Sequence, residues 1–283
     1  MTIFKKAVDL RFFLKEFTDS KLKTGFIPTM GALHKGHISL IAKSKENDSL
    51  TICSIFVNPV QFNDPKDYEK YPVTIEKDIL MLEQAGCDIL FLPSVKEIYP
   101  NGPIQDKQYN LGYLETVLEG RYRPGHFQAV CMVIDKLLTI VKPNNLYLGR
   151  KDYQQCMVIK SLVTQLGWDE TINVEICNTL REDDGLAMSS RNMRLNADER
   201  KKATAIYKAL EFLKKHLAAG NLDDLKEKAK QILTADGFRP DYVEIADAGT
   251  LEIITEWDGR KKIVGLIAAF MNEVRLIDNM PLN

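Results

Sequence analysis

Short runs of β-branched and aliphatic residues alternate with longer amphipathic stretches over the first two-thirds of the chain. Runs of strand length lie at residues 25–29, 50–57, 87–92, 145–149 and 171–177. Stretches of helical length lie between them, at residues 37–46, 74–85, 127–141 and 152–166. Each is long enough to be the crossover that two parallel strands require. The alternation predicts an α/β fold with a doubly wound parallel sheet.

The pattern changes after Asn178, where a polar loop of sequence REDDGLAMSSRNMR begins. Asn196, followed by Glu199 three positions later, is typical of a capped helix start. Apolar residues at helical spacing then predict a long amphipathic helix that stops at Gly220. A second helix is expected at residues 222–234.

Three strand-like runs follow, at residues 242–246, 262–270 and 273–277. The last two are separated only by Met271 and Asn272, which predicts a tight hairpin. This part of the chain is expected to be a smaller α+β domain. We therefore predict two domains, at residues 1–178 and 179–283.

Composition narrows the class of protein. The 283 residues are 45% hydrophobic and 27% charged, which is typical of a globular domain, and the formal net charge is -1. A chain so close to neutral has no global attraction for nucleic acid or anionic lipid, so neither partner is expected. The N-terminus lacks a signal-peptide pattern and no run of about 18 apolar residues occurs. A cytoplasmic protein is expected, with five cysteines that form no C-x-x-C pair and act as structural thiols.

The first stretch with chemical meaning is GFIPTMGALHKGHISLI, in which a predicted strand leads through a glycine-containing turn to a predicted helix. Backbone N–H groups at a helix start are unpaired and favour a phosphate. His34 and His37 flank the turn and can donate N–H to oxygens that gain charge at the α-phosphorus, which stabilises the transition state. The alternative is a pair of surface histidines in a loop.

The second stretch, FVNPVQFNDPKDYEKYP, begins where a predicted strand ends. Ligands of open parallel sheets bind beyond the carboxyl ends of the strands. Asn58 and Gln61 carry neutral amides there that can bond a hydroxyl and a carboxylate without neutralising a nucleophile. The alternative for Asn58 is turn formation with Pro59.

The third stretch, LYLGRKDYQQ, repeats the order of strand, glycine and helix start. Lys151 is a point charge suited to the β- and γ-phosphates, and Asp152 can accept from ribose or from Lys151. Gln155 is one turn further along the predicted helix, on the same side as Asp152. The alternative is a solvated helix start with an ion pair.

The fourth stretch, REDDGLAMSSRN, joins the two predicted domains. The hydroxyls of Ser189 and Ser190 and the guanidinium of Arg191, in a flexible segment, have the chemistry of a mobile phosphate clamp. A charged loop without function is the alternative.

These four stretches resemble the nucleotidyltransferase superfamily, whose H-I-G-H-like and K-M-S-K-S-like motifs match residues 34–37 and 188–191. Five strings in order, PTMGALHKGH, SIFVNPVQF, RPGHF, KDYQQ and DGLAMSSRN, look like the pantothenate synthetase family over essentially the whole chain. The resemblance implies a Rossmann-like nucleotide-binding and catalytic domain at residues 1–178 and a lid at 179–283.

The resemblance also implies a two-step reaction. The carboxylate of pantoate attacks the α-phosphorus of ATP and expels pyrophosphate, and the amine of β-alanine then attacks the pantoyl adenylate and releases AMP. The implied catalytic residues are His34, His37 and Lys151, and the implied contacts of pantoate and β-alanine are Gln61, Gln155 and Asn58. The implied ATP contacts are Met30, Gly31, Ala32, Leu33, His34, Lys35, Gly36, His37, Gly149, Arg150, Lys151, Asp152, Leu180, Met188, Ser189, Ser190 and Arg191.

Further expectations come with the family. Mg²⁺ is expected on the ATP phosphates, because it binds through substrate oxygens with few protein ligands, and Asp78 is a candidate ligand. A homodimer is implied. Arg150 departs from the family, most of whose members carry an acidic or amide residue there, and Ala129 replaces the usual glycine. His126 is expected to be structural and His216 solvated.

Two rival functions belong to other classes. A cytidylyltransferase or an enzyme similar to a tRNA synthetase shares the histidine motif, but a tRNA partner predicts a basic appended domain that this chain does not show. A regulatory protein that binds nucleotide without catalysis predicts decayed motifs, whereas both histidines, Lys151, both glutamines and the Ser-Ser-Arg sequence are present.

Overall fold

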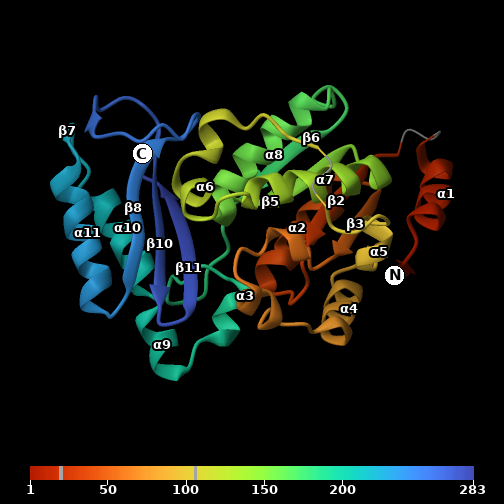
Figure 1. The fold of residues 1–283 in the computed structure, drawn as a ribbon, viewed down its shortest axis with the longest axis horizontal. Coiled ribbons are helices and arrows are strands. Elements are labelled where there is room, and N and C mark those ends of the chain that lie inside the picture. Colours follow the sequence, from red (N-terminus) through yellow and green to blue (C-terminus); the bar gives the residue numbers. More distant parts are fainter. Residues whose placement is uncertain (19–21, 105–106) are drawn as a thin grey trace. The chain divides into compact units, whose positions relative to one another are not determined.

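The chain forms two compact units in the computed structural model, which describes residues 1–18, 22–104 and 107–283 (Figure 1). One unit comprises Met1–Arg150 and Gln154–Asn178. The other comprises Lys151–Tyr153 and Thr179–Asn283. The chain thus leaves the first unit for three residues before it finally enters the second.

The first unit is built on a six-stranded sheet in which every neighbouring pair of strands is parallel. Its order, β1-β4-β3-β2-β5-β6, reverses direction along the chain as a doubly wound sheet requires. The α/β fold class is therefore confirmed. The strands are β1 (Thr2–Phe4), β2 (Thr24–Thr29), β3 (Leu50–Ile55), β4 (Ile89–Phe91), β5 (Asn145–Gly149) and β6 (Asn173–Cys177).

Helices cover both faces of this sheet. On one face, α1 (Ala7–Thr18), α7 (His126–Val141) and α8 (Tyr153–Gln165) pack on alternate residues of the strands. On the other, α2 (Lys35–Asn47) and α4 (Ile75–Gln84) pack on the intervening residues. Because successive side chains of a strand point to opposite faces, apolar runs such as β3 are buried on both sides.

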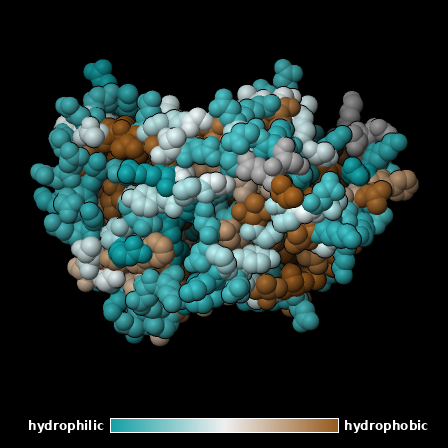
Figure 2. All heavy atoms as spheres, viewed as in Figure 1, coloured by the Kyte–Doolittle hydropathy of each residue, from teal (hydrophilic) through white to brown (hydrophobic). Residues whose placement is uncertain are grey.

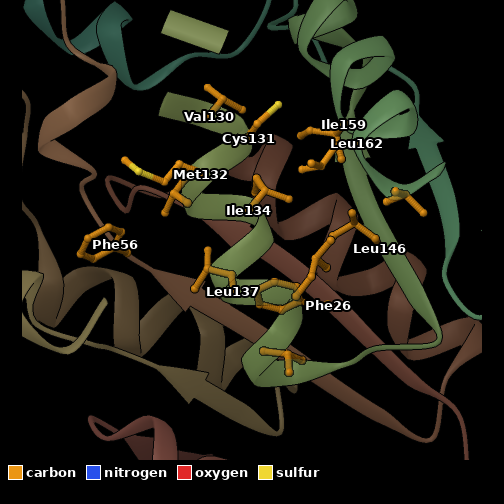
Figure 3. Close-up of a cluster of buried hydrophobic side chains, with 14 of the residues drawn as sticks. Phe26, Phe56, Val130, Cys131, Met132, Ile134, Leu137, Leu146, Ile159 and Leu162 are labelled. Atoms are coloured by element: carbon orange, nitrogen blue, oxygen red, sulfur yellow. The ribbon is translucent and has the colours of Figure 1, made fainter. Parts of the chain in front are cut away.

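The larger core of this unit lies between α7 and the sheet. Figure 3 shows Phe26 and Leu146 of the strands beside Leu137 and Ile134 of α7, with Ile159 and Leu162 of α8 nearby. Full burial of each such side chain contributes roughly 1.5–3 kcal/mol of transfer free energy. Short elements complete the unit: η1 (Pro59–Gln61), α3 (Pro65–Glu69), α5 (Val95–Ile98), η2 (Gly112–Glu115) and α6 (Leu118–Tyr122).

The second unit is an α+β arrangement, as the sequence predicts. An antiparallel sheet of order β11-β10-β8 packs its apolar side chains on two helices, α10 (Ala205–Lys215) and α11 (Asp223–Ala235). The strands of the sheet are β8 (Arg239–Asp247), β10 (Ile263–Met271) and β11 (Val274–Pro281). Its smaller elements are η3 (Arg150–Asp152), which begins in the first unit, η4 (Ser190–Arg194), α9 (Ala197–Lys202), β7 (Gly220–Asn221) and β9 (Glu256–Trp257).

Two local expectations are wrong. The long helix predicted after Asn196 is interrupted between α9 and α10, where the hydroxyl of Thr204 donates to the carbonyl of Lys201 and competes with the helical backbone bonds. The hairpin turn is Asn272–Glu273 rather than Met271–Asn272, because Met271 still pairs with Val274 and Asn272 takes the left-handed conformation (φ 50°) that asparagine tolerates.

Hydrophilic residues cover most of the face seen in Figure 2, and apolar residues gather there only in small patches. Among the residues that the structure describes, no helix has the length and apolarity needed to cross a bilayer.

Candidate active site

The turn after β2 is held by a buried carboxylate from α4. Asp78 is fully buried, and its Oδ2 and Oδ1 atoms accept the backbone N–H groups of Ala32 at 2.9 Å and Leu33 at 2.8 Å. The Thr74 hydroxyl donates to Oδ1 at 3.0 Å. Gly31 (φ 79°) and Ala32 (φ 48°) have left-handed backbone conformations. This conformation costs an alanine free energy, which the hydrogen bonds around the turn must offset. Asp78 therefore shapes the turn that carries both motif histidines.

His34 and His37 cap α2 reciprocally. Nδ1 of His34 accepts the backbone N–H of Gly36 at 3.2 Å, and Nδ1 of His37 accepts the backbone N–H of His34 at 3.3 Å. The two ring centroids are 4.0 Å apart. Because each Nδ1 accepts, the proton of each neutral ring is on Nε2, which makes Nε2–H the donor.

This capping changes how the turn can bind a phosphate. The sequence predicts a helix that starts near His37 and offers unpaired backbone N–H groups, whereas α2 starts at Lys35 with His34 as its N-cap. The N–H groups of His34 and Gly36 are already bonded to the imidazoles. The turn therefore has two imidazole Nε2–H groups as side-chain donors in addition to its remaining backbone N–H groups.

Asn58, Gln61 and Met30 are brought together beyond the ends of β2 and β3. The Nδ2 of Asn58 donates to Oε1 of Gln61 at 3.1 Å, and the Nε2 of Gln61 contacts the sulfur of Met30 at 3.0 Å. Asn58 is 1% exposed and also caps η1 by accepting from the Val60 N–H. The Asn58 side chain therefore serves both the turn and the orientation of Gln61.

Arg123 and His126 also hold this segment, a role that sequence reasoning missed. Nη2 of Arg123 donates to the backbone carbonyl of Gln61 at 3.2 Å, and Nδ1 of His126 lies 2.8 Å from the same oxygen. The structural role expected for His126 fits this position, but its connection to Gln61 was not foreseen. The RPGHF string was the available signal, since it stands among the strings that carry the resemblance.

The residues around the end of β5 are divided between the two units. Gly149, Arg150 and Gln155 belong to the first unit, and Lys151 and Asp152 to the second. Lys151 is 17% exposed and its Nζ lies 3.5 Å from Oδ1 of Asp152. Gln154, rather than Gln155, is the buried member of the pair, since its amide bonds the backbone of Leu114, Val117 and Glu119. The half-buried side chain of Gln155 is the one left at the surface.

Residues 180–191 form a hairpin and the start of η4 within the second unit. Arg181 pairs with Ala187, and the Met188 N–H donates to the carbonyl of Leu180 at 3.1 Å, so the two residues expected near adenine are adjacent. The Ser189 hydroxyl accepts the Arg191 N–H at 3.3 Å and caps η4. The buried Ser190 follows directly. This unit therefore carries Lys151, Asp152, Leu180 and residues 188–191.

The remaining ATP-motif residues lie in the first unit. Ala32 and Leu33 are buried, Lys35 is exposed, and Met30, Gly36 and Arg150 are intermediate. The free thiols of Cys53, Cys87, Cys131 and Cys156 are buried, and burial raises the pKa of Cys87 to about 11. Burial also raises the pKa of Cys53 and Cys131, so these three thiols are poor nucleophiles at neutral pH, which fits the expected structural role.

Comparison with known proteins finds relatives over the whole length of the chain. The family model described as Pantoate-beta-alanine ligase matches residues 2–281. The pantothenate synthetase of Cytophaga hutchinsonii is 45% identical over 274 residues, which are 96% of this chain and 95% of that protein. The crystal structure of the Thermus thermophilus pantothenate synthetase superposes with a TM-score of 0.90 at 37% identity, covering 100% of this chain and 99% of the other.

A second solved structure is similar over the same length. The pantoate-beta-alanine ligase of Francisella tularensis, complexed with Beta-gamma ATP and Beta-alanine, superposes with a TM-score of 0.83 at 38% identity and covers 100% of this chain and 98% of that one. With a family model over nearly the whole chain and full-length relatives well above 30% identity, this chain belongs to the pantoate-beta-alanine ligase family.

Proposed function

We propose that this enzyme condenses pantoate with β-alanine, using ATP and passing through a pantoyl adenylate. Membership of the family supports the overall reaction, and the Francisella relative bound to an ATP species and β-alanine supports the two substrates. The observation that carries the proposal is the pair of imidazoles that cap α2, each with Nδ1 accepting and Nε2 carrying the proton.

In the first step the pantoate carboxylate attacks the α-phosphorus and pyrophosphate leaves. Negative charge shifts onto the phosphate oxygens, so donors fixed before the reaction stabilise the transition state more than the ground state. His34 and His37 fulfil this need without reorganising, because their rings are already bonded to the turn. His37 is also the candidate proton donor in this pair.

In the second step the amine of β-alanine attacks the adenylate carbonyl and AMP leaves. Gln61 is proposed to orient both acid substrates, since its amide can accept and donate at once. Gln155 is proposed as a second contact of pantoate. Asn58 contributes through Gln61, because its side-chain amide is buried against that of Gln61.

The candidate ATP contacts are those that the family resemblance implies. Lys151, Ser189, Ser190 and Arg191 are the candidates for the ATP phosphates, Asp152 and the backbone at Gly149 for ribose, and the backbone at Leu180 and Met188 for adenine. Arg150 adds a further positive charge next to Lys151. Residues 30–37 complete the phosphate side of the proposed site. We also propose that residues 179–283 act as a lid, which ATP and pantoate together should protect from proteolysis.

Magnesium is proposed to arrive with ATP rather than at a resident site. Within residues 1–18, 22–104 and 107–283, no group of three or more His, Cys, Asp or Glu side chains could hold a metal ion. Asp78, the candidate ligand, already accepts two backbone N–H groups and a hydroxyl. The residues present therefore do not fit a protein-held ion, and Mg²⁺ would neutralise phosphate charge through substrate oxygens.

The proposed function is tested by pyrophosphate release from purified protein with ATP, Mg²⁺ and pantoate, each omitted in turn. We expect release to require pantoate, and pantothenate with AMP to accumulate only after β-alanine is added, as identified by mass. ATP binding without turnover would instead favour a regulatory protein, and turnover with another acid would favour another nucleotidyltransferase. Sedimentation of the same sample checks the homodimer that the family implies.

A further inference from the structure

The three residues Lys151–Tyr153 belong to the second unit, although the strand before them and most of the helix after them belong to the first. Two hydrogen bonds link these residues to the rest of the second unit. The Nδ2 of Asn279 on β11 donates to the carbonyl of Lys151 at 2.8 Å. The Tyr153 hydroxyl donates to the carbonyl of Ala248 at 2.7 Å. The backbone that carries the Lys151 ammonium is thus held by side-chain bonds within the second unit.

The residue next to Asn279 holds another part of the proposed phosphate site. Asp278 is 4% exposed and binds the guanidinium of Arg181 through both carboxylate oxygens, at 2.6 and 3.1 Å. Arg181 also donates to the carbonyls of Gly185 and Asn279 and lies over the ring of Tyr207, with 4.8 Å from the guanidinium carbon to the ring centroid. Arg181 therefore closes the hairpin that leads into Ser189 and Arg191.

Asp278 and Asn279 project to opposite faces of β11, because successive side chains of a strand alternate. Asp278 reaches Arg181 on one face, and Asn279 reaches Lys151 on the other. Oδ1 of Asp278 also accepts the backbone N–H of Asn279 at 2.8 Å. Two consecutive residues of one strand thus fix two segments that are well separated in the sequence.

We propose that Asp278 and Asn279 are positioning residues for ATP, with Asn279 setting the backbone of Lys151 and Asp278 setting the hairpin that presents Ser189, Ser190 and Arg191. This inference rests on the proposed function. Neither residue is itself assigned a contact with ATP. Both act by holding the cationic and hydroxyl groups in one fixed relation on a single unit.

The physical reason is that the proposed reaction needs no covalent intermediate with the protein, so its rate depends on where the charged groups are held. Adenylation by this set of residues depends on orientation and on preorganised donors. A displacement of about 1 Å in a positioning group can lower the rate by about 100-fold. Lysine has a long flexible stem, so the location of its ammonium depends on a well-fixed backbone.

The first test combines Asn279→Leu with Lys151→Ala. Leucine has a similar size but cannot donate to the Lys151 carbonyl. We expect Asn279→Leu to lower kcat/KM for ATP by about 10- to 100-fold in the wild-type background. In the Lys151→Ala background the further loss should be under about 3-fold, because residues that act as a unit are not additive. Equal losses in the two backgrounds would overturn the assignment.

A matched control is Asn283→Leu. The Asn283 side chain also donates to a backbone carbonyl of the second unit, that of Lys261, at 2.9 Å. It should lower the melting temperature without changing kcat/KM for ATP. If Asn279→Leu does not fold, Asn279→Ser serves instead, because serine tolerates the polar surroundings and is too short to reach Lys151.

The second test concerns Asp278→Asn, which removes one of the two carboxylate acceptors of Arg181. Its control is Asp241→Asn. Asp241 on β8 accepts from Nε of Arg275 at 2.8 Å, and Arg275 is on β11, the strand that also carries Asp278. Asp278→Asn should raise KM for ATP and show little further effect in an Arg191→Ala background, whereas Asp241→Asn should lower stability alone. Parallel behaviour of the two variants would assign Asp278 a purely structural role.

These tests separate the inference from the proposed function. If the wild-type protein does not release pyrophosphate with ATP and pantoate, the proposed function fails. If it does, and Asn279→Leu and Asn283→Leu have the same kcat/KM for ATP, the positioning role of Asn279 fails while the function stands.

Discussion

The imidazole rings of His34 and His37 lie with their centroids 4.0 Å apart, and the Nδ1 atom of each accepts a backbone N–H of the turn that joins them. The same atoms therefore cap a helix and select the ring tautomer. Substitution by asparagine can distinguish the capping role of His34 from a role as a donor to substrate. Asparagine caps helices well but lacks an imidazole N–H.

The variant His34→Asn is expected to keep the cap and lose the donor. The free energy of unfolding should change by less than about 0.5 kcal/mol, while His34→Ala should lower it by about 1 kcal/mol. Both should lower pantoate-dependent pyrophosphate release by about 100- to 1000-fold, the effect of removing one preorganised donor. Denaturant unfolding and a rate assay on the same samples check this. A His34→Asn enzyme with the wild-type rate would limit His34 to capping.

The variant Asp78→Asn tests which role the buried carboxylate has. An amide presents one oxygen acceptor and one N–H donor group, so one of the Ala32 and Leu33 N–H groups loses its partner, at a cost of about 1–3 kcal/mol. We expect lower stability and a lower adenylation rate, with the Mg²⁺ concentration for half-maximal rate unchanged. The control is Asp88→Asn, whose carboxylate accepts the Thr51 N–H at the amino end of β4. A rise in the Mg²⁺ requirement specific to Asp78→Asn would show that Asp78 contacts the ion.

The variant Gly149→Ala tests whether Gly149 is needed for ATP to approach the backbone or only for packing within the protein. In the described part of the chain, a Cβ on Gly149 would meet no atom within 4 Å beyond its chain neighbours, and its φ is not left-handed. Stability should stay the same or rise by up to about 1 kcal/mol, while KM for ATP should rise because a methyl group occupies the proposed ribose position. Gly185→Ala is the contrast, since its Cβ would overlap the ring of Tyr207 and φ is 89°. An unchanged KM for ATP in Gly149→Ala would remove Gly149 from the proposed ATP site.

The thiols should differ in their reaction with iodoacetamide. Burial raises the pKa of Cys87 to about 11 and that of Cys131 to about 12, so at a pH of about 8 the reactive thiolate fraction of each is very small. Burial also raises the pKa of Cys177, but that side chain is half-buried and accessible. Mass spectrometry of the native protein should find alkylation at Cys177, increasing with pH, and at the other four only after unfolding. Early labelling of Cys87 would contradict the buried core between β3, β4 and α4.

The order of strands and helices followed from the sequence because the apolar residues of each element recur at the spacing typical of a strand or a helix. The apolar run of β3 and the 3.6-residue pattern of α7 are local signals, and both elements are close to where they were expected. β1 was not predicted, because a three-residue edge strand is too short for a pattern and is defined by pairing with β4. The break at Thr204 depends on a hydrogen bond from the Thr204 hydroxyl to the Lys201 carbonyl, and the spacing of apolar residues does not predict that bond.

The chemistry of the site divides in the same way. The residue types and their order predicted a phosphate site, an acid-binding amide and a cationic loop, because motif spacing within a short stretch constrains local geometry. Only the tertiary structure decided that Asp78 holds the histidine turn, that Asn58 and His126 hold Gln61, and that Lys151 is fixed by Asn279. Asn279 is 128 residues from Lys151 in the sequence, and such a bond exists only after the strands have paired and brought distant backbone groups within hydrogen-bond distance.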